Sequence, residues 1–156
     1  MISKSKIQTQ KIATKLAKKI ISEGIHKNAR VLALIGDLGS GKTAFTQGFI
    51  KALGIKTHVP SPTFVIYRKY PLKSQKLNVR GQVFKDIYHF DLYRIHKPKE
   101  VIDLDFKKII KNPENIVLIE WPEKILNYLP KNTIEIYFGH RKKQKEREVC
   151  VRNRFV

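Results

Sequence analysis

Apolar residues recur at helical spacing near the start of the chain. Between residues 7 and 21 they fall three or four positions apart while lysines fill the other face, which predicts an amphipathic helix. The uninterrupted apolar run at 31–35 is typical of a short strand buried on both faces. Residues 42–53 return to helical spacing and end before Gly54, a residue suited to a helix C-terminus. This part of the chain therefore predicts a helix, a buried strand, a glycine-bearing turn and a second helix.

The rest of the chain continues to alternate strand and helix patterns. Segments rich in β-branched and aromatic residues predict strands, and a helix is expected to start at Pro98. The polar segment 71–82 is expected to connect two strands at the surface. The expected strands cover residues 63–70, 83–93, 115–120, 133–138 and 147–151, and the later helix covers residues 98–111. This alternation favours an α/β layered sheet with an antiparallel portion.

The composition fits one compact domain. The chain has 156 residues, of which 42% are hydrophobic, so we expect a single domain over residues 1–156. The longest clean apolar run is far shorter than the roughly 20 residues that a membrane span needs, and the first residues lack the apolar stretch of a signal peptide. Cys150 is the only cysteine, so an internal disulfide is excluded. Together these features predict a cytoplasmic protein without membrane contact.

The chain is strongly basic. It has 32 Lys and Arg residues against 13 Asp and Glu residues, a formal net charge of +19. Such a charge attracts polyanions, which in a cytosol are RNA, DNA and nucleotides. Lysines lie along the whole length, which suits a generally lysine-rich composition as well as a dedicated nucleic-acid surface. The charge alone therefore does not name a partner.

A phosphate-binding motif follows the first expected strand. The pattern G-x-x-x-x-G-K-[ST] is matched at every fixed position by Gly36-Asp37-Leu38-Gly39-Ser40-Gly41-Lys42-Thr43. A buried strand before it and an amphipathic helix after it are the context that this motif requires. Glycines let successive backbone N–H groups point at phosphate oxygens, and the helix adds its positive N-terminal end. The Lys42 ammonium is expected to reach the β- and γ-phosphates, and the Thr43 hydroxyl to ligate Mg²⁺.

The motif sharpens the expected fold class. It predicts an α/β protein with a P-loop NTPase-type layered sheet, flanking helices and an antiparallel portion. Mg²⁺ bound to phosphates calls for a carboxylate, normally at the C-terminal end of a neighbouring strand. Glu120 ends one apolar run and Asp91 follows Tyr88-His89-Phe90. These two acids and Lys42 are the candidate catalytic residues.

Three further motifs follow the P-loop along the chain. They are Ser61-Pro62-Thr63-Phe64, Tyr88-His89-Phe90-Asp91-Leu92-Tyr93-Arg94 and Glu120-Trp121-Pro122. Together with the P-loop, and in this order, they resemble the TsaE family, also called YjeE, the P-loop ATPase of the bacterial machinery that makes threonylcarbamoyladenosine in tRNA. The P-loop is generic, whereas the other three motifs together are specific to that family. The resemblance spans roughly residues 9–151.

The resemblance implies a role for each motif. Thr43 and Glu120 would be the Mg²⁺ ligands, Lys42 the phosphate lysine, and Asp91 an acid near the γ-phosphate or its attacking water. Ser61, Pro62 and Thr63 resemble a switch-like loop, in which the Thr63 hydroxyl would sense the γ-phosphate. The implied nucleotide-binding positions are Thr9, Asp37, Leu38, Gly39, Ser40, Gly41, Lys42, Thr43, Ala44 and Arg147.

Some positions keep two interpretations. Ala13 stands where the family usually has a glycine, and the tail around Arg147 is hard to align, so Thr9 and Arg147 also suit ordinary surface roles. Trp121, the only tryptophan, suits core or interface packing as well as contact with a nucleotide or partner. For His89 we expect packing.

The resemblance also implies a function. The protein would be a Mg-dependent ATPase that acts with the TsaD and TsaB proteins to form threonylcarbamoyladenosine in tRNAs that read codons starting with adenine. ATP and Mg²⁺ would be its cofactors, its activity would be weak without partners, and tRNA would be met through the complex, with no DNA partner. The alternative is a small-molecule P-loop kinase, which needs an acceptor site and usually a lid bearing arginines. A pure RNA-binding module would leave the P-loop unexplained.

Overall fold

A single mixed sheet organises the chain. The computed structural model describes residues 1–56, 65–72, 83–140 and 147–153. Its strands are β1 (Ile2–Ser3), β2 (Arg30–Gly36), β3 (Tyr67–Pro71), β4 (Asp86–Asp91), β5 (Asn115–Glu120), β6 (Ile134–His140) and β7 (Arg147–Asn153). The α-helices are α1 (Lys6–Glu23), α2 (Lys42–Ala52), the short α3 (Lys99–Val101) and α4 (Lys107–Lys111). A 3₁₀ helix, Pro122–Tyr128, follows β5.

The sheet is parallel in its centre and antiparallel at both edges. The strand order is β1-β7-β6-β2-β5-β4-β3. Strand β2 pairs in parallel with β5 and β6, and β5 pairs in parallel with β4. The pairs β1–β7, β6–β7 and β3–β4 are antiparallel. This topology confirms the predicted α/β class with its antiparallel portion.

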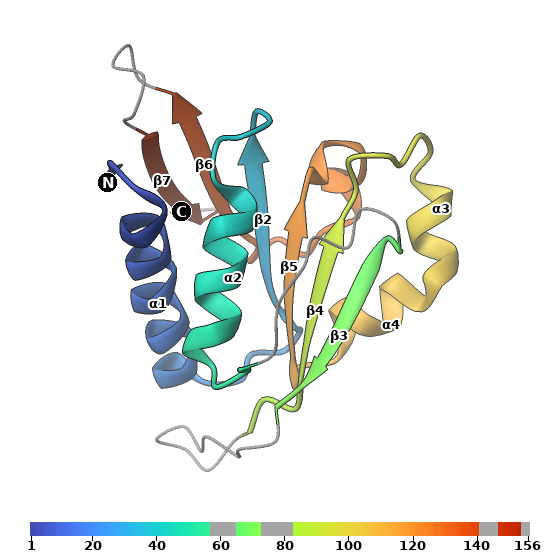
Figure 1. Ribbon diagram of the computed structural model, residues 1–156. Coiled ribbons are helices and arrows are strands. Elements are labelled where there is room, and N and C mark those ends of the chain that lie inside the picture. Colours follow the sequence, from blue (N-terminus) through green and yellow to red (C-terminus); the bar gives the residue numbers. More distant parts are fainter. Residues whose placement is uncertain (57–64, 73–82, 141–146, 154–156) are drawn as a thin grey trace.

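Helices cover both faces of the sheet. Helices α1 and α2 lie side by side over one face, and α3 and α4 pack against the other face on the side of β3 and β4 (Figure 1). Ser5 begins α1 as its N-cap, because its hydroxyl accepts a hydrogen bond from the Gln8 N–H at 3.2 Å. The two long helices pack closely: a Cβ on Gly48 would lie 2.7 Å from the Gln10 Cα. The N-terminus of α1 is thereby held near the N-terminus of α2.

Strand β2 is buried on both faces, as its apolar run predicts. Leu32 and Leu34 pack into the core under α1 and α2, whereas Val31 and Ala33 face the core on the other side. The first core includes Phe45, Phe49, Ile87, Leu118 and Ile136. The second includes Phe90, Phe106, Ile110, Ile119 and Ile125. The P-loop therefore follows directly after a central strand that is buried on both faces.

Three local expectations differ from the structure. The helix expected over residues 98–111 is broken, because Leu104 and Asp105 leave helical geometry and Asp105 has a φ of 58°. The strand expected over 83–93 is confined to Asp86–Asp91. The strand expected over 63–70 is β3, which starts only at Tyr67 after a residue of positive φ, Ile66. Its expected start, and positions 73–82 of the polar segment, lie outside the described residues.

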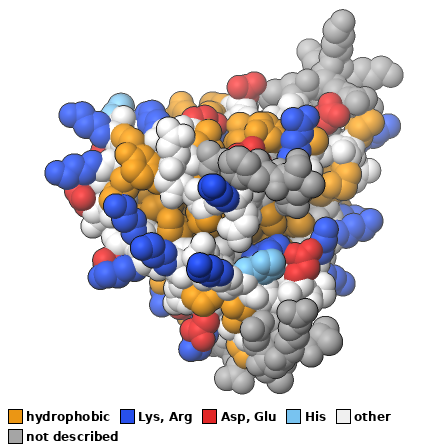
Figure 2. Space-filling view, turned by 180° about the vertical axis from the view of Figure 1, so that it is seen from behind, with side chains coloured by type: hydrophobic (Ala, Val, Ile, Leu, Met, Phe, Trp, Pro, Cys, Tyr) orange, Lys and Arg blue, Asp and Glu red, His pale blue; other side chains and the backbone are white. Residues whose placement is uncertain are grey.

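Basic side chains are scattered over one face of the molecule. Figure 2 shows this face, seen from behind, with Lys and Arg side chains near the edge where α3 and α4 lie and others across the centre, and with acidic side chains among them. Basic side chains on this face therefore do not form one compact patch. Among the described residues, no helix combines the length and apolar character that crossing a membrane requires.

Candidate nucleotide-binding site

The parallel centre of the sheet brings the candidate chemical groups to one edge. Strand β2 runs into the P-loop at Gly36, and Asp91 and Glu120 are the last residues of β4 and β5. In the sheet register, Glu120 lies between Leu34 of β2 and Asp91 of β4. The carboxyl ends of parallel strands form the usual ligand-binding edge of such sheets. Both acids therefore lie beside the P-loop.

The P-loop backbone depends on glycine where it leaves β2 and where it enters α2. Gly36 has a φ of 149°, and a Cβ there would lie 2.4 Å from the carbonyl oxygen of Phe138. Gly41, with a φ of 107°, is the N-cap residue directly before α2. Between them the Ser40 N–H donates to the carbonyl oxygen of Asp37 at 3.2 Å. This turn presents the N-terminus of α2 to the space in front of the loop, where backbone N–H groups bind phosphate oxygens.

The Lys42 side chain is folded back onto the loop. Its ammonium donates to the carbonyl oxygens of Gly36 at 2.5 Å and of Asp37 at 2.8 Å, and lies 3.7 Å from the centre of the Trp121 ring. The residue is buried. This burial lowers the pKa of the Lys42 ammonium below its ordinary value, while the charge of Glu120 acts in the opposite direction.

The Glu120 carboxylate is held by three donors. Its Oε2 accepts a hydrogen bond from the Thr43 hydroxyl at 2.9 Å. Its Oε1 accepts one from the Thr46 hydroxyl at 3.2 Å and lies 2.9 Å from Nε2 of His89. Only 2% of Glu120 is exposed. A buried carboxylate with this set of partners is fixed in one orientation.

Asp91 and Trp121 form the wall opposite α2. The Asp91 Oδ1 accepts a hydrogen bond from the Tyr93 N–H at 3.1 Å, so the chain turns directly after β4. The Tyr93 and Trp121 rings pack with their centres 5.1 Å apart. Trp121 has a φ of 60°, in the left-handed region, and this places its ring over the Lys42 ammonium. Trp121 thus packs against the second core, as one interpretation expected, and its ring also contacts the ammonium of Lys42. Contact with a nucleotide or partner stays a prediction.

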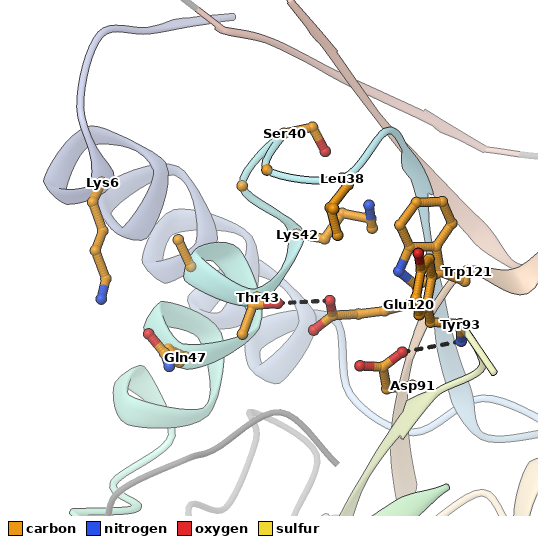
Figure 3. A pocket seen from close by; sticks show the side chains of 13 residues that line it. Lys6, Leu38, Ser40, Lys42, Thr43, Gln47, Asp91, Tyr93, Glu120 and Trp121 are labelled. Atoms are coloured by element: carbon orange, nitrogen blue, oxygen red, sulfur yellow. Dashed lines mark hydrogen bonds between the residues drawn. The ribbon is translucent and has the colours of Figure 1, made fainter. Parts of the chain in front are cut away.

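These groups surround one pocket of about 500 Å³ (Figure 3). In Figure 3 the Thr43 and Glu120 side chains meet across its floor, and Leu38, Lys42 and Trp121 gather on one side. Lys6 and Gln47 extend from the two long helices on the other side. Lining residues come from the P-loop, α1, α2 and the ends of β4 and β5.

Most predicted site residues belong to this pocket. Asp37 contributes its carbonyl oxygen to Lys42. The predicted residues that line the pocket are Leu38, Gly39, Ser40, Gly41, Lys42, Thr43, Ala44, Asp91 and Glu120. Their contacts with a nucleotide remain predictions.

Thr9 does not line the pocket, and the side chains of the other remaining predicted positions lie outside the described residues. Thr9 is fully buried, and its hydroxyl lies 2.8 Å from that of Ser3, which suits a structural role at the start of α1. The switch-like loop Ser61-Pro62-Thr63 lies outside the described residues, as does the side chain of Arg147.

Sequence reasoning gave no site role to five residues that contribute to the site. Thr46 and His89 hold Glu120, while Lys6, Gln47 and Tyr93 line the pocket. Two of these had a readable signal. Thr46 stands one helical turn after the motif threonine, on the same face, and His89 precedes Asp91 by two positions, on the same face of its strand.

The fold and this site define a P-loop nucleotide-binding protein. The family model described as "Threonylcarbamoyl adenosine biosynthesis protein TsaE" matches residues 3–149. The chain therefore belongs to the TsaE family, which confirms the resemblance in its motifs.

Individual relatives agree. The tRNA threonylcarbamoyladenosine biosynthesis protein TsaE of Rickettsia prowazekii is 39% identical over 124 residues, covering 79% of this chain and 77% of the relative. The protein of that name from Bacillus subtilis is 36% identical over 132 residues, covering 83% and 75%. The crystal structure of Bacillus subtilis YdiB superposes with a TM-score of 0.64 at 28% identity and covers 96% of this chain and 80% of that one.

Proposed function

We propose that this chain is a Mg-dependent ATPase that acts with TsaD and TsaB to form threonylcarbamoyladenosine in tRNAs that read codons starting with adenine. Its membership of the TsaE family supports the pathway. The observation that best supports ATPase chemistry is the hydrogen bond of 2.9 Å from the Thr43 hydroxyl to Glu120, in the same pocket as the Lys42 ammonium. Phosphoryl transfer depends mainly on positioning and charge neutralisation, and this pocket has the groups for both.

The P-loop would bind the triphosphate. Its backbone N–H groups and the N-terminus of α2 would receive the phosphate oxygens. The Lys42 ammonium already lies in the pocket, bonded to the carbonyl oxygens of Gly36 and Asp37. A γ-phosphate is a stronger acceptor than a neutral carbonyl, because it is ionised. Binding therefore draws Lys42 away from these oxygens and toward the phosphates.

The residues at the pocket floor fit a magnesium ion. Mg²⁺ prefers oxygen ligands and binds through one or two protein groups together with substrate phosphates. Thr43 and Glu120 supply a hydroxyl and a carboxylate that already contact each other. Because Glu120 accepts the Thr43 hydrogen, the lone pairs of the Thr43 oxygen remain available to the ion. When bound, the ion would neutralise charge on the β- and γ-phosphates.

Asp91 would act on the attacking water. Its carboxylate lines the pocket next to Glu120, and one of its oxygens is oriented by the Tyr93 N–H. A carboxylate in this position accepts a hydrogen bond from water and holds it for attack on the γ-phosphorus. The bond from that phosphorus to the bridging oxygen breaks, giving ADP and phosphate, and the water proton passes to the products.

Phosphate release tests this proposal. We expect slow release by the isolated protein and faster release when purified TsaB and TsaD are added, with both rates lost in Glu120→Ala. Glu114→Ala is the matched control, since Glu114 precedes the opposite end of β5 and pairs with Lys85 at 2.8 Å. Equal rates in the wild type and Glu120→Ala would contradict the proposal. A phosphorylated small molecule in place of free phosphate would favour the kinase alternative.

A further inference from the structure

His89 is a histidine buried beside the floor of the pocket. It lies in β4 and has no exposed surface. Its Nε2 atom lies 2.9 Å from Oε1 of Glu120. Packing alone, which the sequence favoured, leaves this polar contact unexplained, because an apolar side chain would fill the same space.

The direction of this hydrogen bond follows from its partners. An ionised carboxylate only accepts hydrogen bonds, so Nε2 of His89 carries the hydrogen. The other ring nitrogen, Nδ1, is buried and has no hydrogen-bond partner among the described residues. The ring therefore has a single polar contact in the described part of the chain, and that contact is with Glu120.

The two oxygens of Glu120 have separate partners. Oε1 is contacted from the protein interior, by Nε2 of His89 in β4 and by the Thr46 hydroxyl of α2. Among the described residues, Oε2 accepts a hydrogen bond only from the hydroxyl of Thr43, which lines the pocket. Oε1 is thus held by hydrogen bonds to two interior side chains, whereas Oε2 lies beside the threonine of the P-loop.

We propose that His89 is a positioning residue for the metal site: its Nε2–H fixes Oε1 of Glu120, so that Oε2 remains beside Thr43 and faces the bound ion. This inference rests on the proposed function. A glutamate side chain rotates about three bonds, and Thr46 alone, at 3.2 Å, restrains it less than two donors from different elements. Groups that orient a metal ligand in this way typically change metal affinity by about 10- to 100-fold when they are removed.

Two substitutions separate positioning from packing. His89→Met keeps an apolar side chain of similar size but lacks a donor. His89→Gln carries an amide N–H at nearly the reach of Nε2, so it is expected to restore the hydrogen bond. His96→Gln is the matched control, because His96 is exposed and lies in the loop after β4. Thr46→Val removes the other donor to the same oxygen and should act in the same direction as His89→Met.

The readout is the metal dependence of nucleotide affinity. The affinity of the protein for ADP is measured once in the presence of Mg²⁺ and once in the presence of EDTA. Binding of Mn²⁺ in the presence of ADP is followed by electron paramagnetic resonance. In His89→Met we expect the affinity in EDTA to stay at the wild-type level, while the gain due to metal falls by about tenfold or more. His89→Gln should recover most of that gain, and His96→Gln should match the wild type.

Several results would overturn the inference. One is a His89→Met protein with the full metal-dependent gain; another is equal loss of affinity with and without metal in both His89 variants, which would indicate a structural role. A third needs no variant: nitrogen NMR of the wild type should show the hydrogen on Nε2, and finding Nε2 without it excludes the bond. If instead the wild type binds no nucleotide at all, the proposed function fails as well.

Discussion

The Lys42 ammonium lies 3.7 Å from the centre of the Trp121 indole ring, held there while it donates to two carbonyl oxygens of its own loop. A cation over an aromatic face is stabilised by about 0.5–2 kcal/mol. Trp121 also has a left-handed backbone conformation, which is unfavourable for a bulky residue. The indole ring therefore stabilises the lysine in a position that, under the proposed function, the lysine leaves when phosphates bind.

Replacing the indole of Trp121 should make it easier for Lys42 to move to bound phosphates. Trp121→Leu removes the contact with Lys42 but keeps an apolar side chain, and we expect the affinity for Mg-ADP to rise severalfold, up to about tenfold for about 1.4 kcal/mol of lost contact. Trp121→Phe keeps an aromatic face and should stay near the wild type. Calorimetric titration measures both. A clear loss of affinity in Trp121→Leu would mean that the indole contacts the bound nucleotide instead.

The buried lysine should also make stability depend on pH. Burial lowers the pKa of Lys42 in the folded protein below its ordinary value of 10.5, so the unfolded chain binds the proton more tightly. The folded state is then penalised at neutral pH, and the penalty disappears as the pH rises through the lowered pKa toward 10.5. Lys42→Met, which has no charge to bury, should be more stable than the wild type at pH 7.

Comparing the wild type with Lys42→Met separates the effect of Lys42 on stability from the effects of other groups that titrate at alkaline pH. Urea unfolding is measured for both between neutral pH and pH 10.5. The advantage of Lys42→Met should shrink as the pH rises. Lys51→Met, on an exposed lysine at the end of the same helix, should show no such trend. An advantage that is constant with pH would contradict the lowered pKa.

The start of the P-loop should not accept a side chain. In Gly36→Ala the new Cβ meets the Phe138 carbonyl of β6 and also occupies a backbone region that favours glycine. Overpacking of about 1–3 kcal/mol and about 1–2 kcal/mol of backbone strain add in the same direction. We expect a loss of roughly 3 kcal/mol in the free energy of unfolding.

Gly39→Ala is the internal comparison for that measurement. Gly39 also has a positive φ, of 73°, but no atom lies within 4 Å of its added Cβ. The free energy of unfolding of Gly39→Ala should fall only by the cost of backbone strain, about 1–2 kcal/mol. Equal losses for the two variants in chemical denaturation would show that the close approach of β6 does not matter.

Motifs with a fixed spacing made much of the site predictable. The P-loop and the strand-end acids Asp91 and Glu120 could be placed because parallel strands bring their carboxyl ends to one edge. The spacing of His89 and Thr46 places each on the same face as a site residue, but it does not specify the two hydrogen bonds to Glu120 that join β4 and α2 to β5. Each alone is also an ordinary core residue.

In the fold too, elements with a clear sequence pattern could be predicted, whereas features that depend on local geometry or on pairing could not. The apolar run of β2 and the periodicity of α1 and α2 identified these elements, because burial selects the pattern directly. The break at Leu104 and Asp105 went unseen, since helical spacing continues on both sides of it and Asp tolerates a left-handed conformation. The two-residue strand β1 is too short to have a pattern and depends on its pairing with β7.

Formation of threonylcarbamoyladenosine in tRNA tests the central claim most directly. Purified TsaB and TsaD are combined with tRNA, the threonylcarbamoyl donor, Mg-ATP and either the wild-type chain or Glu120→Gln, and modified nucleoside is measured over many turnovers. Glu120→Gln keeps the shape of the side chain but removes its charge. Sustained modification with the wild type and its loss with Glu120→Gln is the predicted result. Equal modification with both proteins would contradict an ATPase centred on this carboxylate.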